Sequence, residues 1–452
     1  MKRVLTLLLL AWSVLGWAQR TAVREEVLSD WNKASGLDCV YDCSPKAQTP
    51  APSGYKAFYI SHYARHGSRY AYTEKTYSVP LEVLRSGADA GLLTPRGAAL
   101  LTALEAFWAE HRWQVGDLTP LGWAQHEWIA AQMVQSFPGA FGKGSRVDGC
   151  SSPSPRAIMS MTSECLSLAR KAPKTAIYTH QSMLDVQATR PNHGGENPFR
   201  YTGPENVFPY PDSNEAFLEH VFPEYGNVLK RLLRDPSRCL GGRSEMRILH
   251  YLYMLVGGMN SLPEAERIDV SGIFTPSEYA HMWEAFNYES LREYIKYRTS
   301  CSAVIDDMVA KADERLALRR GAKGRDVVLR GAKGRVDRNA ACGADLRFGH
   351  DHVLLTLLQI MDIDRMGQYP ASADDLPLWF QNFRSPMAAN IQLVFFDKAC
   401  GRGDVLVKVL LNGEEVRLGT LKGIDAAPYG PFYRWEALRS YLNARTALFV
   451  TR

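Results

Sequence analysis

Two neighbouring runs decide the fold of this chain: Tyr55-Lys56-Ala57-Phe58-Tyr59-Ile60 and, after four further residues, Arg65-His66-Gly67-Ser68-Arg69-Tyr70. The first run is apolar and aromatic enough to predict a buried strand. The second run sets one histidine between two arginines and follows it with a glycine. A strand that ends in a glycine-containing loop is where an open α/β sheet presents its functional groups. The two runs therefore predict an α/β fold with a site at the end of this strand.

The residue types in the second run indicate which chemistry that site can perform. The guanidinium groups of Arg65 and Arg69 can each form bidentate hydrogen bonds to a tetrahedral oxyanion. His66 would then face the central atom of the anion, which suits a histidine that attacks phosphorus. An Arg-His-Gly triplet also occurs by chance in charged surface loops, so the rest of the chain has to decide.

Composition places the chain among ordinary globular proteins. Its 452 residues are 46% hydrophobic and 22% charged, and the length suffices for two structural units or for one large domain with an insertion. The formal net charge of +5 is too small to indicate nucleic-acid binding. We expect a small-molecule partner and no nucleic acid.

Residues 1–18 have the pattern of a signal peptide. Lys2 and Arg3 form a basic start, an apolar stretch follows to Trp17, and Ala18 ends a cleavage site. The apolar stretch is too short to span a bilayer, and no later segment is long and apolar enough. We expect a secreted or periplasmic protein without a membrane span.

The chain also contains eight cysteines and one basic repeat. The eight cysteines permit disulfides in an exported chain, and Cys39 and Cys43 are close enough to bridge locally. No cysteine spacing fits a zinc site. The run Arg320-Gly-Ala-Lys-Gly-Arg325 recurs ten residues later within a basic, glycine-rich stretch, 319–338. This stretch is either a solvated loop or a cationic arm that attracts polyanionic substrates.

Hydrophobic periodicity predicts a central mixed sheet flanked by helices, with an inserted, mostly helical cap. The α/β core is assigned to 19–179 and 341–452, and the cap to 180–340. Within the core the chain order predicts the following elements: strand 55–60, helices 94–112 and from 120, strand 146–150, a helix to about 170, strand 344–349, a helix from 353 to 361, strands 391–396 and 405–411, a hairpin turn at Asn412-Gly413, and a last helix 433–442. Helical patterns in the cap cover 213–235, 244–258, 276–299 and 301–318. The loop after the first strand and two later strand-to-helix turns would meet at one sheet edge.

Taken together, these segments resemble the histidine phosphatase superfamily, in its histidine acid phosphatase and phytase branch. The resemblance runs from about 55 to 440 and is nearest to the multiple inositol polyphosphate phosphatase group. The segments that carry it are Arg65 to Arg69, Asp117 to Gly122, Ser151 to Ser160 with Arg156, Leu346 to His350, Asn390 to Phe395 and the hairpin at 404–418.

The resemblance implies a role for each site residue. His66 would be the nucleophile that forms a phosphohistidine, and Asp351 would be the proton donor. The phosphate oxygens would be held by four residues: Arg65, Arg69, Arg156 and His350. Such a reaction needs no metal or other cofactor. Since the donor must be protonated, the resemblance also implies an acidic pH optimum.

The chain departs from the family pattern at two positions. Ala71 stands where the hallmark loop often has a proline. His350-Asp351-His352 stands where the inositol polyphosphate group usually has His-Ala-Glu, so His352 is a rival proton donor to Asp351. A metal site built on His62, His66 and the later histidines is disfavoured, because neighbouring arginines repel cations.

Three functions remain open at this stage. The first is a secreted phosphomonoesterase acting on phytate and lower inositol phosphates. The second is a broad-specificity acid phosphatase that acts on sugar or nucleotide monoesters. The third is a phosphate-ester binding protein that has lost catalysis, and the unusual His350-Asp351-His352 run keeps it in view.

Overall fold

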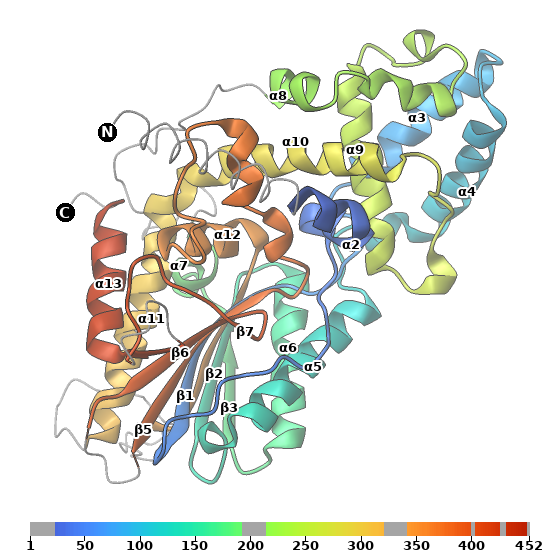
Figure 1. The fold of residues 1–452 in the computed structure, drawn as a ribbon. Coiled ribbons are helices and arrows are strands. Elements are labelled where there is room, and N and C mark those ends of the chain that lie inside the picture. The colour runs from blue at the N-terminus through green and yellow to red at the C-terminus, as the bar shows by residue number, and fades with distance from the viewer. Residues whose placement is uncertain (1–22, 192–213, 321–340, 399–402, 425–430, 450–452) are drawn as a thin grey trace, which may run out of the picture.

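The computed structural model describes residues 23–191, 214–320, 341–398, 403–424 and 431–449 (Figure 1). The expected signal peptide, 1–18, lies outside these residues, and so does nearly all of the basic stretch 319–338. In the described parts of the chain, no helix combines the length and the apolar character that crossing a membrane requires.

A mixed sheet forms the centre of the molecule, which confirms the predicted α/β class (Figure 1). In spatial order its strands are β3 (Ala176–His180), β2 (Arg146–Ser151), β4 (Gly343–Gly349), β1 (Tyr55–Arg65), β5 (Asn390–Lys398), β6 (Leu406–Leu411) and β7 (Glu414–Glu415), with β8 (Phe432–Arg434) paired to β6. β1 pairs in parallel with β4 and antiparallel with β5. β2 pairs in parallel with both β3 and β4. The carboxyl ends of four parallel strands therefore share one edge of the sheet.

The two faces of the sheet carry separate apolar cores because strand side chains alternate. Tyr59 and Tyr63 of β1 pack in a core that also contains residues of α11 (Arg298–Arg319), α12 (Asp351–Ile360) and α13 (Trp435–Ala447). Ile60 and Ala64 of the same strand belong to the core on the other face, under α5 (Pro120–Ser136) and α6 (Pro155–Lys171). Both faces of β1 are thus buried, as its apolar sequence requires.

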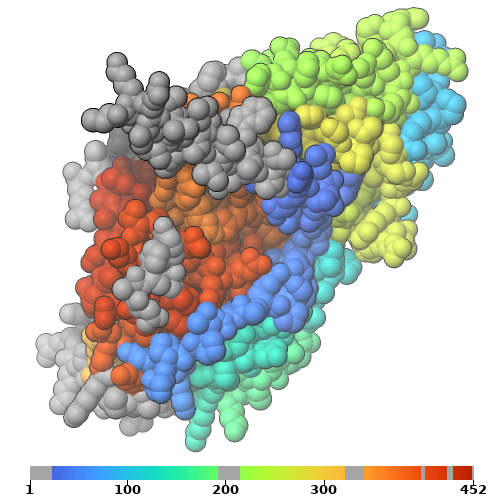
Figure 2. All heavy atoms as spheres, viewed as in Figure 1, coloured from blue at the N-terminus to red at the C-terminus, as the bar shows by residue number. Residues whose placement is uncertain are grey.

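A third core is built mainly from helices and lies beyond the edge at which the parallel strands end (Figure 1). It is formed chiefly by α3 (Lys75–Asp89), α4 (Pro95–His111), α9 (Glu245–Gly258) and α10 (Pro276–Tyr294), with α8 (Asn214–Val221) against α10. In Figure 2 this green, yellow and light-blue part forms one end of the molecule. On the face seen in Figure 2, the blue N-terminal segment runs from α2 (Trp31–Ala34) to the start of β1.

Some helices pack outside the domain to which the sequence assigns them. The domain bounds expected from the sequence stay a prediction. α11 falls within the expected cap, 180–340, yet it contacts β1, α12 and α13. α3 and α4 fall within the expected core, 19–179, yet they pack in the helical core with α9. Helical periodicity records that one face of a helix is buried, but it does not record which partner covers that face.

Most of the expected helices and strands lie within a few residues of their predicted bounds. Thr94 and Thr119 accept backbone hydrogen bonds at the starts of α4 and α5, each followed by a proline at the first helical position. Among the elements that were not predicted are the long helix α3 and the exposed edge strand β3. The expected helical stretch 213–235 is helical only over α8 and then continues in 3-10 turns.

The local disulfide that the spacing of Cys39 and Cys43 allowed is not formed. All seven cysteines in the described ranges are free thiols, while Cys400 lies outside them. Cys39 is buried and Cys43 is exposed, so their side chains occupy different environments. The spacing permitted a bridge and the sequence left the pairing open; in the structure both residues are free thiols.

Candidate active site

A cavity of about 380 Å³ lies between the carboxyl edge of the sheet and the helical core. Three segments supply its floor: the loop after β1, the β2–α6 turn and the start of α12 after β4. The sequence-predicted residues that line it are His66, Arg69, Arg156, His350, Asp351 and His352. Arg65 is fully buried behind them, with Nη2 3.8 Å from Oδ2 of Asp351. The structure thus brings all seven predicted site residues together.

His66 is held in one orientation and one tautomer. Its Nδ1 lies 3.0 Å from the carbonyl oxygen of Gly67. A carbonyl oxygen can only accept, so Nδ1 carries the proton and Nε2 keeps its lone pair. Burial, together with the charges of Arg156 and Arg65, lowers the pKa of His66 well below its ordinary value. The imidazole is therefore neutral, which is the state that a nucleophile requires.

Buried arginines around His66 have donors left over. Five arginine side chains in the described part of the chain keep a buried Nε without a hydrogen-bond acceptor. Arg96 lies on α4, and the other four belong to the site: Arg65, Arg69, Arg156 and Arg190. Arg65 uses Nη1 for the carbonyl oxygens of Leu37 and Ser385, at 2.7 and 2.6 Å, which fixes the guanidinium and leaves Nη2 unbonded as well. Unbonded buried donors are costly unless an anion takes them, so this arrangement is suited to a phosphate group.

Arg190 is a site residue that the sequence analysis missed. It directly follows the short helix α7 (Val186–Thr189) and lines the cavity. Its positive charge contributes to lowering the pKa values of Arg156 and His350, which places it beside them. No motif surrounds Arg190 in the sequence, and its segment carried no predicted element, so no local pattern could have identified it.

His350 lies directly across from His66. Their ring centroids are 5.6 Å apart, and His350 Nε2 is 2.9 Å from the hydroxyl oxygen of Ser152 on the β2–α6 turn. Burial, followed by the effect of His352, lowers the pKa of His350 well below its ordinary value. These surroundings therefore keep His350 neutral. It can donate to an oxyanion only from a nitrogen that carries a proton.

Asp351 and His352 open helix α12 and face the same cavity. Tyr294 donates to Oδ2 of Asp351 across 3.4 Å. Burial alone would raise the pKa of Asp351, but the Arg65 guanidinium and His352 hold it well below its usual range. His352 stacks on His350 with ring centroids 5.5 Å apart, and its Nδ1 is 3.6 Å from Oδ1 of Asp351. The carboxyl group is thus ionised.

Helices α5 and α6 hold the loop that carries His66. Ser160 accepts from the Gly67 amide at 3.0 Å, and Gln125 accepts from the Ser68 amide at 2.9 Å. Gly67 and Gly122 pack backbone against backbone, because a Cβ built on Gly67 would lie 2.4 Å from the Gly122 carbonyl oxygen. Both glycines are needed for this close approach.

His62 belongs to a different, fully buried cluster. Its Nε2 is 3.9 Å from Glu164, and Glu164 accepts from Nδ1 of His126 at 2.8 Å. His62 is absent from the lining of the cavity, so it does not share a site with His66. Burial, which outweighs the attraction of Glu164, lowers the pKa of His62 to about 4.

Comparison with solved structures shows that the fold is shared with two kinds of enzyme. The multiple inositol polyphosphate phosphatase of Bifidobacterium longum, in complex with inositol hexasulfate, is 16% identical, with a TM-score of 0.68 over 91% of this chain and 97% of that chain. The phosphate complex of the same enzyme is 16% identical, with a TM-score of 0.66 over 92% of this chain and 98% of that chain. The phytase from D. castellii is 14% identical, with a TM-score of 0.62 over 93% of this chain and 86% of that chain. No protein-family model matches the sequence, and no curated protein matches it. The predicted resemblance is thus confirmed at the level of the fold.

Proposed function

We propose that this protein is a phosphate monoester hydrolase that acts on inositol phosphates through a phosphohistidine. One observation carries the proposal: the free Nε2 of His66 faces a cavity lined by Arg69, Arg156 and Arg190 and backed by Arg65, and each of these arginines keeps a buried Nε that has no acceptor among the described residues. A phosphoryl group offers the negative oxygens that such donors bind. The fold shared with an inositol polyphosphate phosphatase and a phytase supports the substrate class.

The first step forms a bond between His66 Nε2 and phosphorus and breaks the bond from phosphorus to the ester oxygen. Asp351 gives its proton to the leaving alkoxide, which is otherwise a poor leaving group. In the second step water attacks the phosphohistidine, and Asp351 takes a proton from that water. His66 is released with its lone pair restored, and inorganic phosphate leaves the cavity.

Because Arg65 and His352 hold the pKa of Asp351 well below its usual range against the effect of burial, the substrate supplies the proton that Asp351 passes on. A phosphate monoester with a second pKa near 6 binds as a monoanion below that pH and brings the proton with it. Once its proton has passed to Asp351, the bound phosphate is a dianion, and its two negative charges offset the charge of Arg65 that lowers the pKa of Asp351. The acidic optimum expected from the sequence follows from this proton supply, and the low pKa of His66 keeps the nucleophile neutral in acid.

Phosphate release tests the proposal directly. Phytate, a lower inositol phosphate and p-nitrophenyl phosphate are each incubated with the enzyme at pH 4.5 and pH 7, and free phosphate is measured. Labelled substrate quenched into alkali should leave a phosphohistidine on the wild-type chain. His66→Ala should lose both signals, whereas His220→Ala, an exposed histidine paired with Asp374, should keep both.

The same assay separates the alternatives. Equal or better turnover of sugar and nucleotide monoesters would favour a broad-specificity acid phosphatase. Binding of phosphate esters without phosphate release at either pH would favour a binding protein and refute the hydrolase.

We also propose export to the periplasm or the exterior, on the pattern of residues 1–18. Mass spectrometry of the protein recovered from its native host should find residue 19 as the first residue. Retention of the leader in a cytoplasmic protein would contradict the proposal.

A further inference from the structure

The hydroxyl group of Tyr63 connects two sides of the candidate active site. Tyr63 lies on β1, shortly before His66 in the sequence, and its side chain is fully buried. The hydroxyl group donates to the carbonyl oxygen of Thr189 at 2.8 Å and accepts from the amide of His350 at 3.2 Å. A carbonyl oxygen can only accept and an amide N–H can only donate, so the direction of both hydrogen bonds is fixed. One hydroxyl group thus joins two segments that are far apart in the sequence.

Each of the two bonded backbone groups lies next to a residue of the site. Thr189 ends α7, and the next residue, Arg190, lines the cavity and keeps a buried Nε without an acceptor among the described residues. His350 is the N-cap of α12, and Asp351 is the first residue of that helix. Tyr63 therefore bonds to the chain beside one of the arginines and beside the expected proton donor.

Gly349 makes room for this hydroxyl group at the end of β4. A Cβ built on Gly349 would lie 2.0 Å from the hydroxyl oxygen of Tyr63 and 2.3 Å from the carbonyl oxygen of Thr189. The carbonyl oxygen of Gly349 also accepts from the amide of His66 at 3.1 Å. Because Gly349 has no side chain, its backbone can approach both groups closely. The loop of His66, the end of α7 and the start of α12 thus meet at one point.

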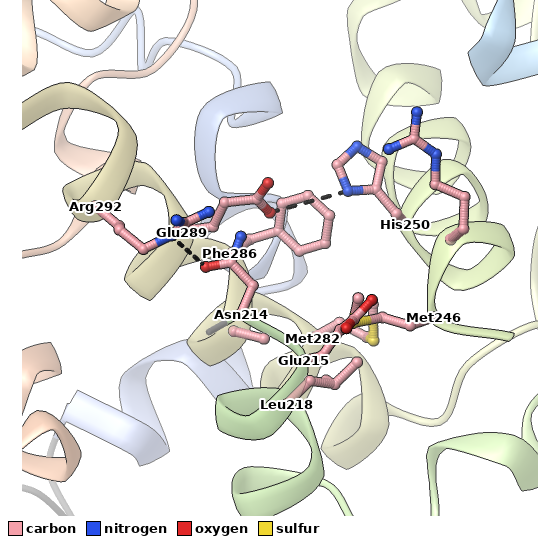
Figure 3. A pocket seen from close by; sticks show the side chains of 11 residues that line it. Asn214, Glu215, Leu218, Met246, His250, Met282, Phe286, Glu289 and Arg292 are labelled. Atoms are coloured by element: carbon pink, nitrogen blue, oxygen red, sulfur yellow. Dashed lines mark hydrogen bonds and ion pairs between the residues drawn. The ribbon is translucent and has the colours of Figure 1, made fainter. Parts of the chain in front are cut away.

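The wall of the cavity opposite the sheet edge is held by contacts between helices. Figure 3 shows a second cavity, of about 320 Å³, and two of its residues, Glu289 and His250, also line the active-site cavity. One dashed line joins His250 Nδ1 to Glu289 Oε2, 3.9 Å apart, and so connects α9 to α10. Another joins Arg292 Nε to Asn214 Oδ1, 2.9 Å apart, and so connects α10 to α8. A change at Tyr63 therefore acts on the sheet side of the cavity and leaves these contacts in place.

We propose that Tyr63 is a positioning residue whose hydroxyl group sets Arg190 and Asp351 at fixed distances from His66. The inference rests on the proposed hydrolase function, in which the arginine binds phosphate and the carboxyl group protonates the leaving group. Helix α7 has four residues, and a helix this short needs contacts from outside to keep its end in place. Removal of the hydroxyl group would leave two buried backbone groups unpaired, so both segments would shift.

Tyr63→Phe tests the proposal, because it keeps the ring and removes the hydroxyl group. It should lower kcat for an alkyl phosphate about 10- to 100-fold, as expected when a catalytic group moves by up to about 1 Å. The kcat for p-nitrophenyl phosphate should fall by a smaller factor, because this leaving group depends less on the proton from Asp351. The dissociation constant of inorganic phosphate, measured by calorimetry, should rise about 3- to 10-fold as Arg190 loses its position.

Tyr59→Phe is the matched control. Tyr59 lies on the same strand and in the same core, is also fully buried, and donates to Oδ2 of Asp345 at 2.8 Å. Loss of its hydroxyl group should lower the thermal unfolding midpoint by a similar amount and leave kcat and phosphate binding unchanged. A second comparison isolates Arg190. In an Arg190→Gln background, Tyr63→Phe should change the phosphate dissociation constant by about twofold or less, because the two residues act together.

Three results would overturn the inference. Tyr63→Phe could leave both kcat values and phosphate binding as in the wild type, or Tyr59→Phe could lower kcat equally, which would show that activity follows stability alone. A full effect of Tyr63→Phe in the Arg190→Gln background would show that the hydroxyl group does not act through Arg190. Failure of the proposed function looks different, since the wild type would then release no phosphate from either ester. The calorimetric comparison would decide the inference in that case, and a wild-type protein that binds no inorganic phosphate would overturn it.

Discussion

Replacing Gly67 by alanine should disable the site although the new methyl group touches no substrate. The added Cβ would lie 2.4, 2.7 and 2.8 Å from the carbonyl oxygen, Cα and carbonyl carbon of Gly122. Ordinary contact between such atoms begins near 3.5 Å, so the loop and α5 must separate by about 1 Å. All three obstructing atoms are backbone, and no rotamer change can relieve the clash.

Two costs follow from this 1 Å displacement. Overpacking of this kind destabilises a protein by about 1–3 kcal/mol. The larger effect is on catalysis, because the Gly67 and Ser68 amides that anchor the loop bond to Ser160 and Gln125 at 3.0 and 2.9 Å. A shift of about 1 Å at His66 is expected to lower kcat about 100-fold.

The assay compares kcat for p-nitrophenyl phosphate with the thermal unfolding midpoint. Gly258→Ala is the matched control, because a Cβ at this helical position meets no atom within 4 Å, and it should keep full activity. A Gly67→Ala enzyme within threefold of the wild-type kcat would show that the loop tolerates separation from α5, and the geometric reasoning would be wrong.

Three further outcomes are expected. Asp351→Asn should slow hydrolysis of an alkyl phosphate about 10²–10⁴-fold and slow hydrolysis of p-nitrophenyl phosphate far less. His352→Ala should leave the dependence of the rate on the leaving group unchanged, and the reverse pattern would make His352 the donor. Ser152→Ala removes the hydroxyl group 2.9 Å from His350 Nε2 and should raise KM about 3- to 10-fold. The side chain of Ser154, in the same turn, makes no capping hydrogen bond, so Ser154→Ala should leave KM unchanged. Equal KM values for the two variants would contradict the role of Ser152 in positioning His350. The pKa of His250 is about 4 in the folded state and near 6.5 in the unfolded state, so below pH 6.5 the unfolded state binds more protons. The free energy of unfolding should therefore fall by up to about 3 kcal/mol between pH 6.5 and pH 4. His250→Gln should flatten this fall when unfolding is measured at several pH values, and an equally steep fall in the variant would refute the reasoning.

Local sequence patterns located the floor of the cavity because strand ends define it. The order of strands and helices predicts that the loops after β1, β2 and β4 lie at one edge, and these loops carry His66, Arg156 and His350. The roles assigned to these residues rest on the resemblance and stay predictions.

The opposite wall could not be located in this way. Glu289 lies on an amphipathic helix whose charged residues read as solvent-facing, and only the packing of α10 over the sheet edge turns it toward the cavity. Arg190 follows a very short helix, α7, where neither periodicity nor a motif is present. Side chains of this kind become visible only when tertiary contacts are known.

The position of β1 has a consequence for how the chain matures. The strand is made early, yet both of its neighbours, β4 and β5, lie in the last quarter of the sequence. A nascent chain leaving the ribosome therefore carries an apolar ribbon with two open edges until nearly all of the protein has been synthesised. Until β4 and β5 have been made, the open edges of β1 can pair with other chains, so aggregation competes with folding during most of synthesis.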